Sequence, residues 1–361
     1  MKVSSGTSES IPEIKPQVGS PPLRRWGLRS WQLWVGVVFS LGFIVLALRN
    51  VDLAETVGAL SRVNVLFLGA AIGCYVLTIG AKAIRWQLLL STHKAPSFGR
   101  AFTIFSIGQM MNAFIPAHLG EFARAYLMCE AETDSKVYVL GTVAVERFAD
   151  LLLLLISLVL LLSQIVLPDW LASPARDTSL VMAILVPCLI LLAWQRNFVQ
   201  KVVLWVSHFA PLGWREWLVK QAHFGLTSLD VLRRPRLLVG LIAWSTIICV
   251  LSTLTNYLVF RSMSLQFSIW VSLLILVVLQ IGAAVPSSPG RIGVFQYLVI
   301  LALSILVIDK NVALGYSILL YLVIYVPLTV IGIYCLWREK ITWQSLEEAA
   351  ALVNRLRKRN T

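Results

Sequence analysis

Long runs of apolar residues, separated by short polar segments, fill most of this chain. The runs lie at residues 31–48, 64–84, 101–117, 119–128, 137–163, 179–194, 237–260, 268–285, 292–308 and 312–336. A helix that crosses a bilayer needs about 20 residues, so most of these runs have the length of a membrane span and 119–128 is too short to be one alone. The pattern predicts an all-α integral membrane protein with about eight spans or span pairs.

The composition agrees with a membrane location and excludes a water-soluble fold. Hydrophobic residues make up 58% of the 361 residues and charged residues only 14%, whereas soluble domains carry roughly a quarter charged residues. The net charge of +13 lies in the loops, so we do not expect nucleic acid as a partner. Neither the five Cys nor the four His have metal-site spacing, so we expect no metal, no other cofactor and no disulfide framework.

The distribution of Lys and Arg predicts which loops face the cytoplasm. Segments 1–30, 82–100, 195–236 and 337–361 together hold 22 of the 31 basic residues. Because cytoplasmic loops carry an excess of basic residues, we expect these segments and both termini inside. The expected location is the inner membrane of a cell, as a multi-pass protein.

Three segments lie outside the predicted membrane domain of residues 31–336 or join its parts. Residues 1–30 begin with a Ser- and Pro-rich stretch typical of a disordered cytoplasmic tail. Segment 195–236 mixes Trp with basic residues, as amphipathic segments on an anionic lipid surface do. Residues 337–361 are expected to form a basic cytoplasmic C-terminal helix.

The number of crossings between cytoplasmic segments singles out two hairpins that enter and leave the membrane on one side. Spans 137–163 and 179–194 already supply the two crossings that fit between the second and third basic segments, so residues 101–128 must form a hairpin. The same argument makes residues 268–308 a hairpin that starts and ends outside.

Both hairpins contain a similar break, and their surroundings match. Ile115-Pro116-x3-Gly120 resembles Val285-Pro286-x3-Gly290, and residues 64–163 and 237–336 both read as span, broken hairpin, long span. The two sets start on opposite sides, so we expect an inverted-topology repeat, linked by span 179–194 and segment 195–236 and with a substrate site between the repeats. The alternative is that Pro-x3-Gly is only a common kink signal. The residues expected to break the helices are Pro116, Gly120, Pro286, Pro289, Gly290 and Gly293.

The span 137–163 carries three charged residues at membrane depth. Helical spacing puts Glu146 and Asp150 on one face, with Arg147 within reach of Asp150. A charge near the bilayer centre costs roughly 3 kcal/mol or more, which makes a functional site the first interpretation. In the alternative, the span is 148–167 and Glu146 and Arg147 lie at the cytoplasmic boundary, while Asp150 stays inside.

The hairpins add further charged residues. Glu121 and Arg124 share a helix face in the first hairpin. In the second, a turn rich in Gly and Pro precedes a helix expected to start near Arg291, which offers a cation and free N–H groups to an anion such as phosphate. The alternative is a surface loop with Arg291 in water.

These elements resemble the lysylphosphatidylglycerol synthase transmembrane-domain family, also called the flippase-like domain family, over about residues 30–340. Those that match are Arg85-Trp86, Pro116-x3-Gly120-Glu121-x2-Arg124, Glu146-Arg147-x2-Asp150 and Pro286-Ser-Ser-Pro289-Gly290-x2-Gly293-x-Phe295. Where the family often has Glu after the Phe, this chain has Gln296. The resemblance implies movement of a modified lipid or lipid-linked glycan between leaflets. Only about 25 residues follow the last span, so we do not expect lysine transfer from tRNA.

The leading hypothesis is a membrane lipid translocase that moves a phospholipid, aminoacylated lipid or lipid-linked glycan. Its four Arg would contact phosphate, and its carboxylates would orient them or bind an amine. The expected substrate-binding residues are Arg85, Glu121, Arg124, Glu146, Arg147, Asp150, Arg291 and Gln296. The alternatives are an integral membrane transferase or hydrolase acting on a lipid phosphate, for which no catalytic residues are predicted, and a non-catalytic partner of a separately encoded cytosolic transferase.

Overall fold

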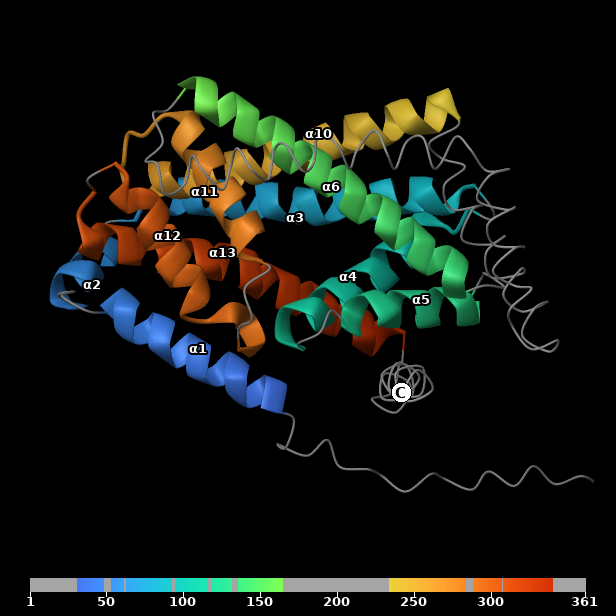
Figure 1. Ribbon diagram of the computed structural model, residues 1–361, viewed down its shortest axis with the longest axis horizontal. Helices are drawn as coiled ribbons and strands as arrows, with labels where there is room; N and C mark the ends of the chain where they lie inside the picture. Colours follow the sequence, from blue (N-terminus) through green and yellow to red (C-terminus); the bar gives the residue numbers. More distant parts are fainter. Residues whose placement is uncertain are drawn as a thin grey trace, which may run out of the picture.

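The computed structural model describes residues 31–48, 53–61, 63–92, 95–115, 119–131, 136–164, 234–283, 288–306 and 308–339. In these ranges all regular secondary structure is helical (Figure 1). The helices are α1 (Trp31–Leu48), α2 (Leu53–Ser61), α3 (Val65–Leu90), α4 (Phe98–Phe114), α5 (Leu119–Ala131), α6 (Lys136–Gln164), α10 (Pro235–Ser262), α11 (Ile269–Gly282), the 3-10 helix η2 (Pro289–Arg291), α12 (Val294–Ser304) and α13 (Lys310–Arg338).

Several predictions fall outside the described residues. They concern the tail at 1–30, the span 179–194, nearly all of segment 195–236, the C-terminal helix beyond residue 339, and the helix breaks at Pro116 and Pro286.

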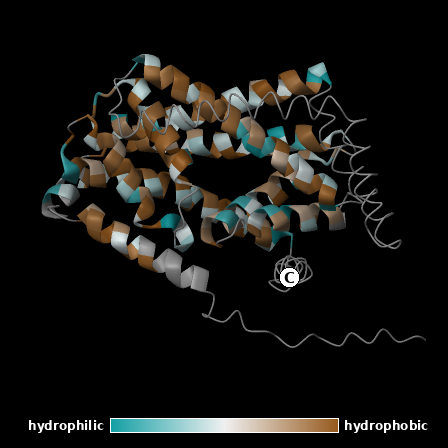
Figure 2. Cartoon of the chain, viewed as in Figure 1, coloured by the Kyte–Doolittle hydropathy of each residue, from teal (hydrophilic) through white to brown (hydrophobic). Residues whose placement is uncertain are grey.

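The fold is that of an all-α membrane protein, as the hydrophobic pattern predicted. Within the described residues, α3, α10 and α13 are long and apolar enough to cross a bilayer. Apolar side chains also lie exposed on the outside of the helices, such as Val250 and Val330, which are 59% and 61% exposed. Figure 2 shows that hydrophobic residues, in brown, make up most of the described helices. In a bilayer the exposed apolar side chains face lipid.

Polar side chains fix where several helices begin. The Asn64 side chain accepts hydrogen bonds from the N–H groups of Leu66 and Phe67 at the start of α3. N-terminal N–H groups have no partner within the helix, so such caps stabilise its first turn. Three other side chains cap helix starts in the same way: Ser97 before α4, Ser268 before α11 and Asp309 before α13.

The described helices form two similar sets that pack on each other. One set is α3, the hairpin α4–α5, and α6, and the other is α10, the hairpin α11–α12, and α13 (Figure 1). Helix α4 packs on α13 of the other set, and α11 packs on α6. Each hairpin therefore contacts the last helix of the opposite set.

Helices α3 and α10 lie side by side and run antiparallel. The Asn64 N–H donates to the Ser262 carbonyl over 2.7 Å, at the start of α3 and the end of α10. Near the middle of both helices, the Cys74 thiol donates to the Leu251 carbonyl over 3.3 Å. Residue numbers rise along α3 while they fall along α10, so the first helices of the two sets point in opposite directions.

The two hairpin helices α4 and α5 approach each other to backbone contact. A Cβ atom added to Gly120 would collide with the carbonyl oxygen of Gly108, and one added to Gly108 would lie 2.8 Å from the carbonyl oxygen of Gly120. Only glycine fits at this crossing, which explains why Gly120 follows the predicted break.

The second hairpin turns through a segment between α11 and α12 that includes η2. Gly290 and Gly293 have φ angles of +78° and +87°, and Arg291 between them has a φ of +55°. Because this backbone is left-handed, α12 begins at Val294 and not near Arg291, where the sequence had placed the helix start. A Cβ on Gly293 would lie 2.5 Å from the Ser40 carbonyl oxygen, so α1 packs directly on this turn.

Helix α3 extends into the basic segment 82–100, which the sequence pattern predicts as a loop. Helix α3 continues to Leu90, and both Lys82 and Arg85 belong to it. The last turns of the helix bury Trp86, Leu89 and Leu90 against neighbouring helices. The apolar run 64–84 ends just before Arg85, but the apolar residues that follow continue the buried face of the helix.

Candidate functional site

Six of the predicted site residues meet between α3, α5 and α6, and we call them the ion cluster. The residues are Arg85 on α3, Glu121 and Arg124 on α5, and Glu146, Arg147 and Asp150 on α6.

Glu146 is the centre of the ion cluster. Its side chain contacts two guanidinium groups, with Arg124 Nη2 2.7 Å from one carboxylate oxygen and Arg85 Nη2 3.3 Å from the other. The residue is 3% exposed, and both arginines are buried. A buried carboxylate is stable only when it is paired and hydrogen-bonded, and two arginines provide this here.

Arg85 connects the carboxylates of α6 with the second set of helices. Its Nη1 donates to Asp150 Oδ1 over 2.6 Å and to the Ser245 hydroxyl on α10 over 3.1 Å. Glu146 and Asp150 contact the same guanidinium, so they lie on one face of α6, as their i,i+4 spacing predicted. This arginine therefore fixes α3, α6 and α10 relative to one another.

Arg147 and Glu121 form the exposed edge of the ion cluster. Arg147 donates from Nη2 and Nε to Glu121 Oε1 over 2.6 Å and 2.9 Å, and its side chain is 45% exposed. Its Nη1 lies 4.0 Å from Asp150 Oδ2, which agrees with the predicted i,i+3 spacing. An ion pair this exposed contributes little to stability.

The Arg124 guanidinium is also held by aromatic rings. Its central carbon lies 4.3 Å from the centre of the Trp86 ring and 4.6 Å from that of Phe105. Trp86 in turn donates from its indole nitrogen to the Thr142 hydroxyl over 3.3 Å. Attraction between the cation and the rings adds to the ion pair and keeps the guanidinium plane fixed.

The ion cluster carries no excess charge. Its three arginines face three carboxylates, and every arginine contacts at least one of them. Arg85, Arg124 and Arg147, which the sequence analysis proposed as phosphate contacts, already have anionic partners within the chain. The arrangement suits a structural junction between helices better than an open anion site.

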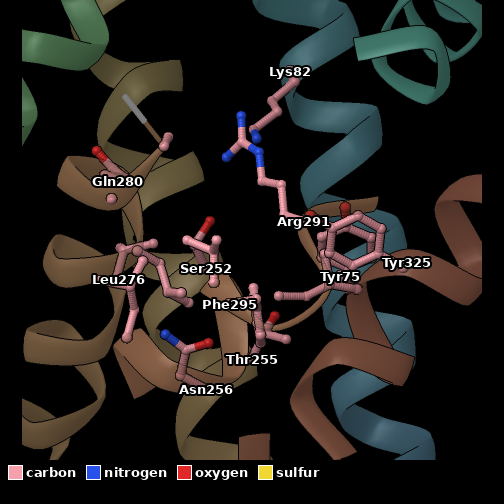
Figure 3. Close-up of a pocket in the computed structure, with 16 residues that line it drawn as sticks. Tyr75, Lys82, Ser252, Thr255, Asn256, Leu276, Gln280, Arg291, Phe295 and Tyr325 are labelled. Atoms are coloured by element: carbon pink, nitrogen blue, oxygen red, sulfur yellow. The ribbon is translucent and has the colours of Figure 1, made fainter. Parts of the chain in front are cut away.

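A separate cavity of about 260 Å³ lies between α3, α10, α11, α12 and α13 (Figure 3). Its walls combine apolar side chains, such as Leu276 and Leu298, with polar ones. The polar residues include Tyr75, Lys82, Ser252, Asn256, Gln280 and Arg291. Both sets of helices contribute to it, so the cavity lies at their interface.

Of the predicted site residues, Arg291 is the one that lines the cavity. It is half-buried there and not fully in water. Its backbone N–H donates to the Ser288 carbonyl over 2.9 Å, and the Tyr321 hydroxyl donates to the Gly290 carbonyl over 2.9 Å. These bonds hold the left-handed turn that presents Arg291 to the cavity.

Lys82 also lines the cavity. The charge pattern places it in the basic segment 82–100 and does not mark it as a site residue. In the part of the chain that the structure describes, neither Lys82 nor Arg291 forms an ion pair. The available signal was its spacing: Lys82 precedes Arg85 by three residues, among apolar residues that continue the helix.

Gln296 has a local role and does not line the cavity. Its side-chain oxygen accepts a hydrogen bond from the Gly293 N–H over 2.7 Å, at the start of α12. This contact caps the helix that follows the left-handed turn. Among the described residues, no group of three or more His, Cys, Asp or Glu side chains is arranged to hold a metal ion.

Comparison with known proteins gives one match. The family model of the lysylphosphatidylglycerol synthase TM region matches residues 33–332. No curated protein and no solved structure matches the chain. The matched range includes the whole ion cluster and every residue of the cavity.

Proposed function

The chain belongs to the lysylphosphatidylglycerol synthase TM region family, and from that membership we propose that it is a membrane lipid translocase. Membership of this family indicates a membrane protein of the lipid-modification or flippase type. The finer proposal is that it moves a phospholipid or lipid-linked glycan from one leaflet to the other.

The observation that carries this proposal is the cavity between the two sets of helices. It contains two cationic side chains, and α3, α10, α11, α12 and α13 all contribute to its walls. A transporter needs a site that opens to either side in turn, and such sites lie where two repeats meet. A head group bound here would be exposed to one leaflet or the other as the two sets moved.

We also propose that the two sets form the inverted repeat expected from the sequence. The antiparallel pairing of α3 with α10 supports this, because a two-fold axis between them exchanges the two helices. The reciprocal packing of α4 on α13 and of α11 on α6 supports it too. Movement of one set against the other would then give alternating access.

In this proposal the ion cluster acts as a junction. It binds α3, α5 and α6 into one body, and through Ser245 it reaches α10. We place both termini in the cytoplasm, on the basis of the basic segments at both ends of the chain. We place the protein in the inner membrane of a cell on the basis of its family.

The experiment that tests the translocase is leaflet exchange in proteoliposomes. Vesicles with and without the purified chain receive fluorescent phospholipids or polyprenyl-phosphate lipids, and a reductant that cannot cross the bilayer destroys the outer-leaflet signal. We expect faster and more complete loss of signal with the protein. A folded protein that exchanges none of these lipids above the empty-vesicle rate contradicts the proposal.

A further inference from the structure

We propose that the cavity selects lipids by charge: Lys82 and Arg291 bind the phosphate of an anionic, hydroxyl-bearing head group, and an aminoacylated head group with its own cation is rejected. This inference rests on the proposed lipid translocase and names the class of lipid that it binds. It also assigns phosphate binding to the cavity, whereas the sequence predicted phosphate contacts in the ion cluster.

The first argument is the unbalanced charge of the cavity. Lys82 enters from α3 and Arg291 from the turn before α12, and Figure 3 shows the cationic ends of both extending into the cavity. Among the described residues that line it there is no Asp or Glu. The carboxylates whose charge acts on Lys82 include Asp150 and Glu146, and both are hydrogen-bonded to Arg85.

Two cations around one cavity repel each other unless an anion lies between them. A phosphate meets this need, since it carries negative charge and accepts hydrogen bonds from both an ammonium and a guanidinium. A cationic substituent on the same head group would add a third positive charge, and the described part of the cavity wall has no carboxylate to pair with it.

The second argument is the backbone at Arg291. Its φ angle of +55° is unfavourable for a residue with a side chain. The flanking glycines and the hydrogen bond from Tyr321 to Gly290 hold the turn in this conformation. Strained backbone of this kind is concentrated at ligand-binding sites, where it fixes a side chain before the ligand arrives.

The third argument is the chemistry of the remaining walls. Ser252 and Asn256 on α10 and Tyr75 on α3 offer neutral donors and acceptors, which match the hydroxyl groups of glycerol or a sugar. Leu276 and Leu298 add an apolar side, suited to the start of an acyl chain. A volume of about 260 Å³ is below that of pockets for drug-sized ligands, so it fits a head group and not a whole lipid.

The test measures equilibrium binding of short-chain lipids to the purified full chain in a neutral detergent. The probes are dihexanoyl phosphatidylglycerol, its lysyl ester, dihexanoyl phosphatidylcholine and inorganic phosphate. We expect phosphatidylglycerol to bind at least tenfold more tightly than the other three. Lys82→Gln and Arg291→Gln should each weaken that binding by about tenfold, because each removes a hydrogen bond between charged groups.

Four further variants test the roles of folding, total charge and charge sign. Lys82→Arg and Arg291→Lys keep the positive charges and should keep the preference for phosphatidylglycerol. Arg338→Gln removes one charge from the exposed end of α13, away from the cavity, and should bind like wild type. Lys82→Glu supplies the missing carboxylate and should shift the preference toward the lysyl ester.

The result that overturns the inference is equal affinity for phosphatidylglycerol and its lysyl ester, or unchanged affinity in Lys82→Gln and Arg291→Gln. Inorganic phosphate that binds as tightly as the lipid would overturn the assignment to a lipid head group. The two proposals can fail separately. If the lipids bind in the expected pattern but leaflet exchange does not exceed that of empty vesicles, the charge-selective site is supported and the transport proposal is contradicted.

Discussion

The Arg124 guanidinium lies 2.7 Å from the Glu146 carboxylate, and both side chains are buried between α5 and α6. Trp86 and Phe105 cover the same guanidinium. The guanidinium charge is therefore paired with a carboxylate and covered by two aromatic rings. This contact supports our proposal that the ion cluster stabilises the helix packing and that a ligand binds in the cavity.

Glu146→Gln should strongly destabilise the protein. The variant leaves Arg124 without its carboxylate and Arg85 with only Asp150, and breaking a buried ion pair costs about 3 kcal/mol or more. Thermal unfolding in detergent measures the loss. Glu121→Gln is the matched control, since its partner Arg147 is 45% exposed and an exposed ion pair is worth about 1 kcal/mol or less. Equal effects of the two variants would contradict this account.

Arg124→Lys should destabilise the protein although it keeps the charge. The planar Arg124 guanidinium lies against Trp86 and Phe105 and also contacts Glu146. The ammonium group of a lysine is not planar and cannot make both kinds of contact equally well. We expect a loss of about 1–2 kcal/mol, from the weakened cation–ring and hydrogen-bond contacts. Arg100→Lys, at the half-exposed pair with Glu339, should have little effect in the same unfolding assay.

Gly120→Ala should separate the helices of the first hairpin. The added Cβ would collide with the Gly108 carbonyl oxygen, and overpacking of this kind costs about 1–3 kcal/mol. Gly99→Ala is the matched control on α4, because a Cβ there meets nothing within 4 Å. The control should be neutral or slightly stabilising, since Ala favours a helix more than Gly does. A wild-type melting temperature for Gly120→Ala would argue against the backbone crossing.

Tyr321→Phe should weaken binding of phosphatidylglycerol several-fold while it leaves thermal stability nearly unchanged. The variant removes the hydrogen bond to the Gly290 carbonyl, which helps to hold Arg291 in its left-handed conformation. Tyr321 acts as a positioning residue and is not among the residues that line the cavity. Tyr334→Phe, on the exposed side of α13, serves as the control and should bind like wild type. Parallel loss of stability and affinity would instead indicate a general structural role.

The sequence predicted the class of fold because membrane helices are encoded locally. In a bilayer, an apolar run of about 20 residues can pair its backbone N–H and C=O groups within itself only as a helix. Local patterns also predicted the turn around Gly290 and the shared face of Glu146 and Asp150, while the two hairpins followed from the number of crossings between basic segments. The apolar pattern ends at residue 84, just before Arg85, while the buried face of α3 continues to Leu90.

Only the tertiary structure decided which charges are paired and which are not. Arg85 and Glu146 are separated by 61 positions in the sequence, and Lys82 and Arg291 come from opposite halves of the chain. Residue type and spacing predict that a membrane arginine needs a partner, but the partner depends on which helices meet. Packing brings three carboxylates to three arginines and leaves Lys82 and Arg291 facing one cavity, so the location of the unbalanced charge is a property of the fold.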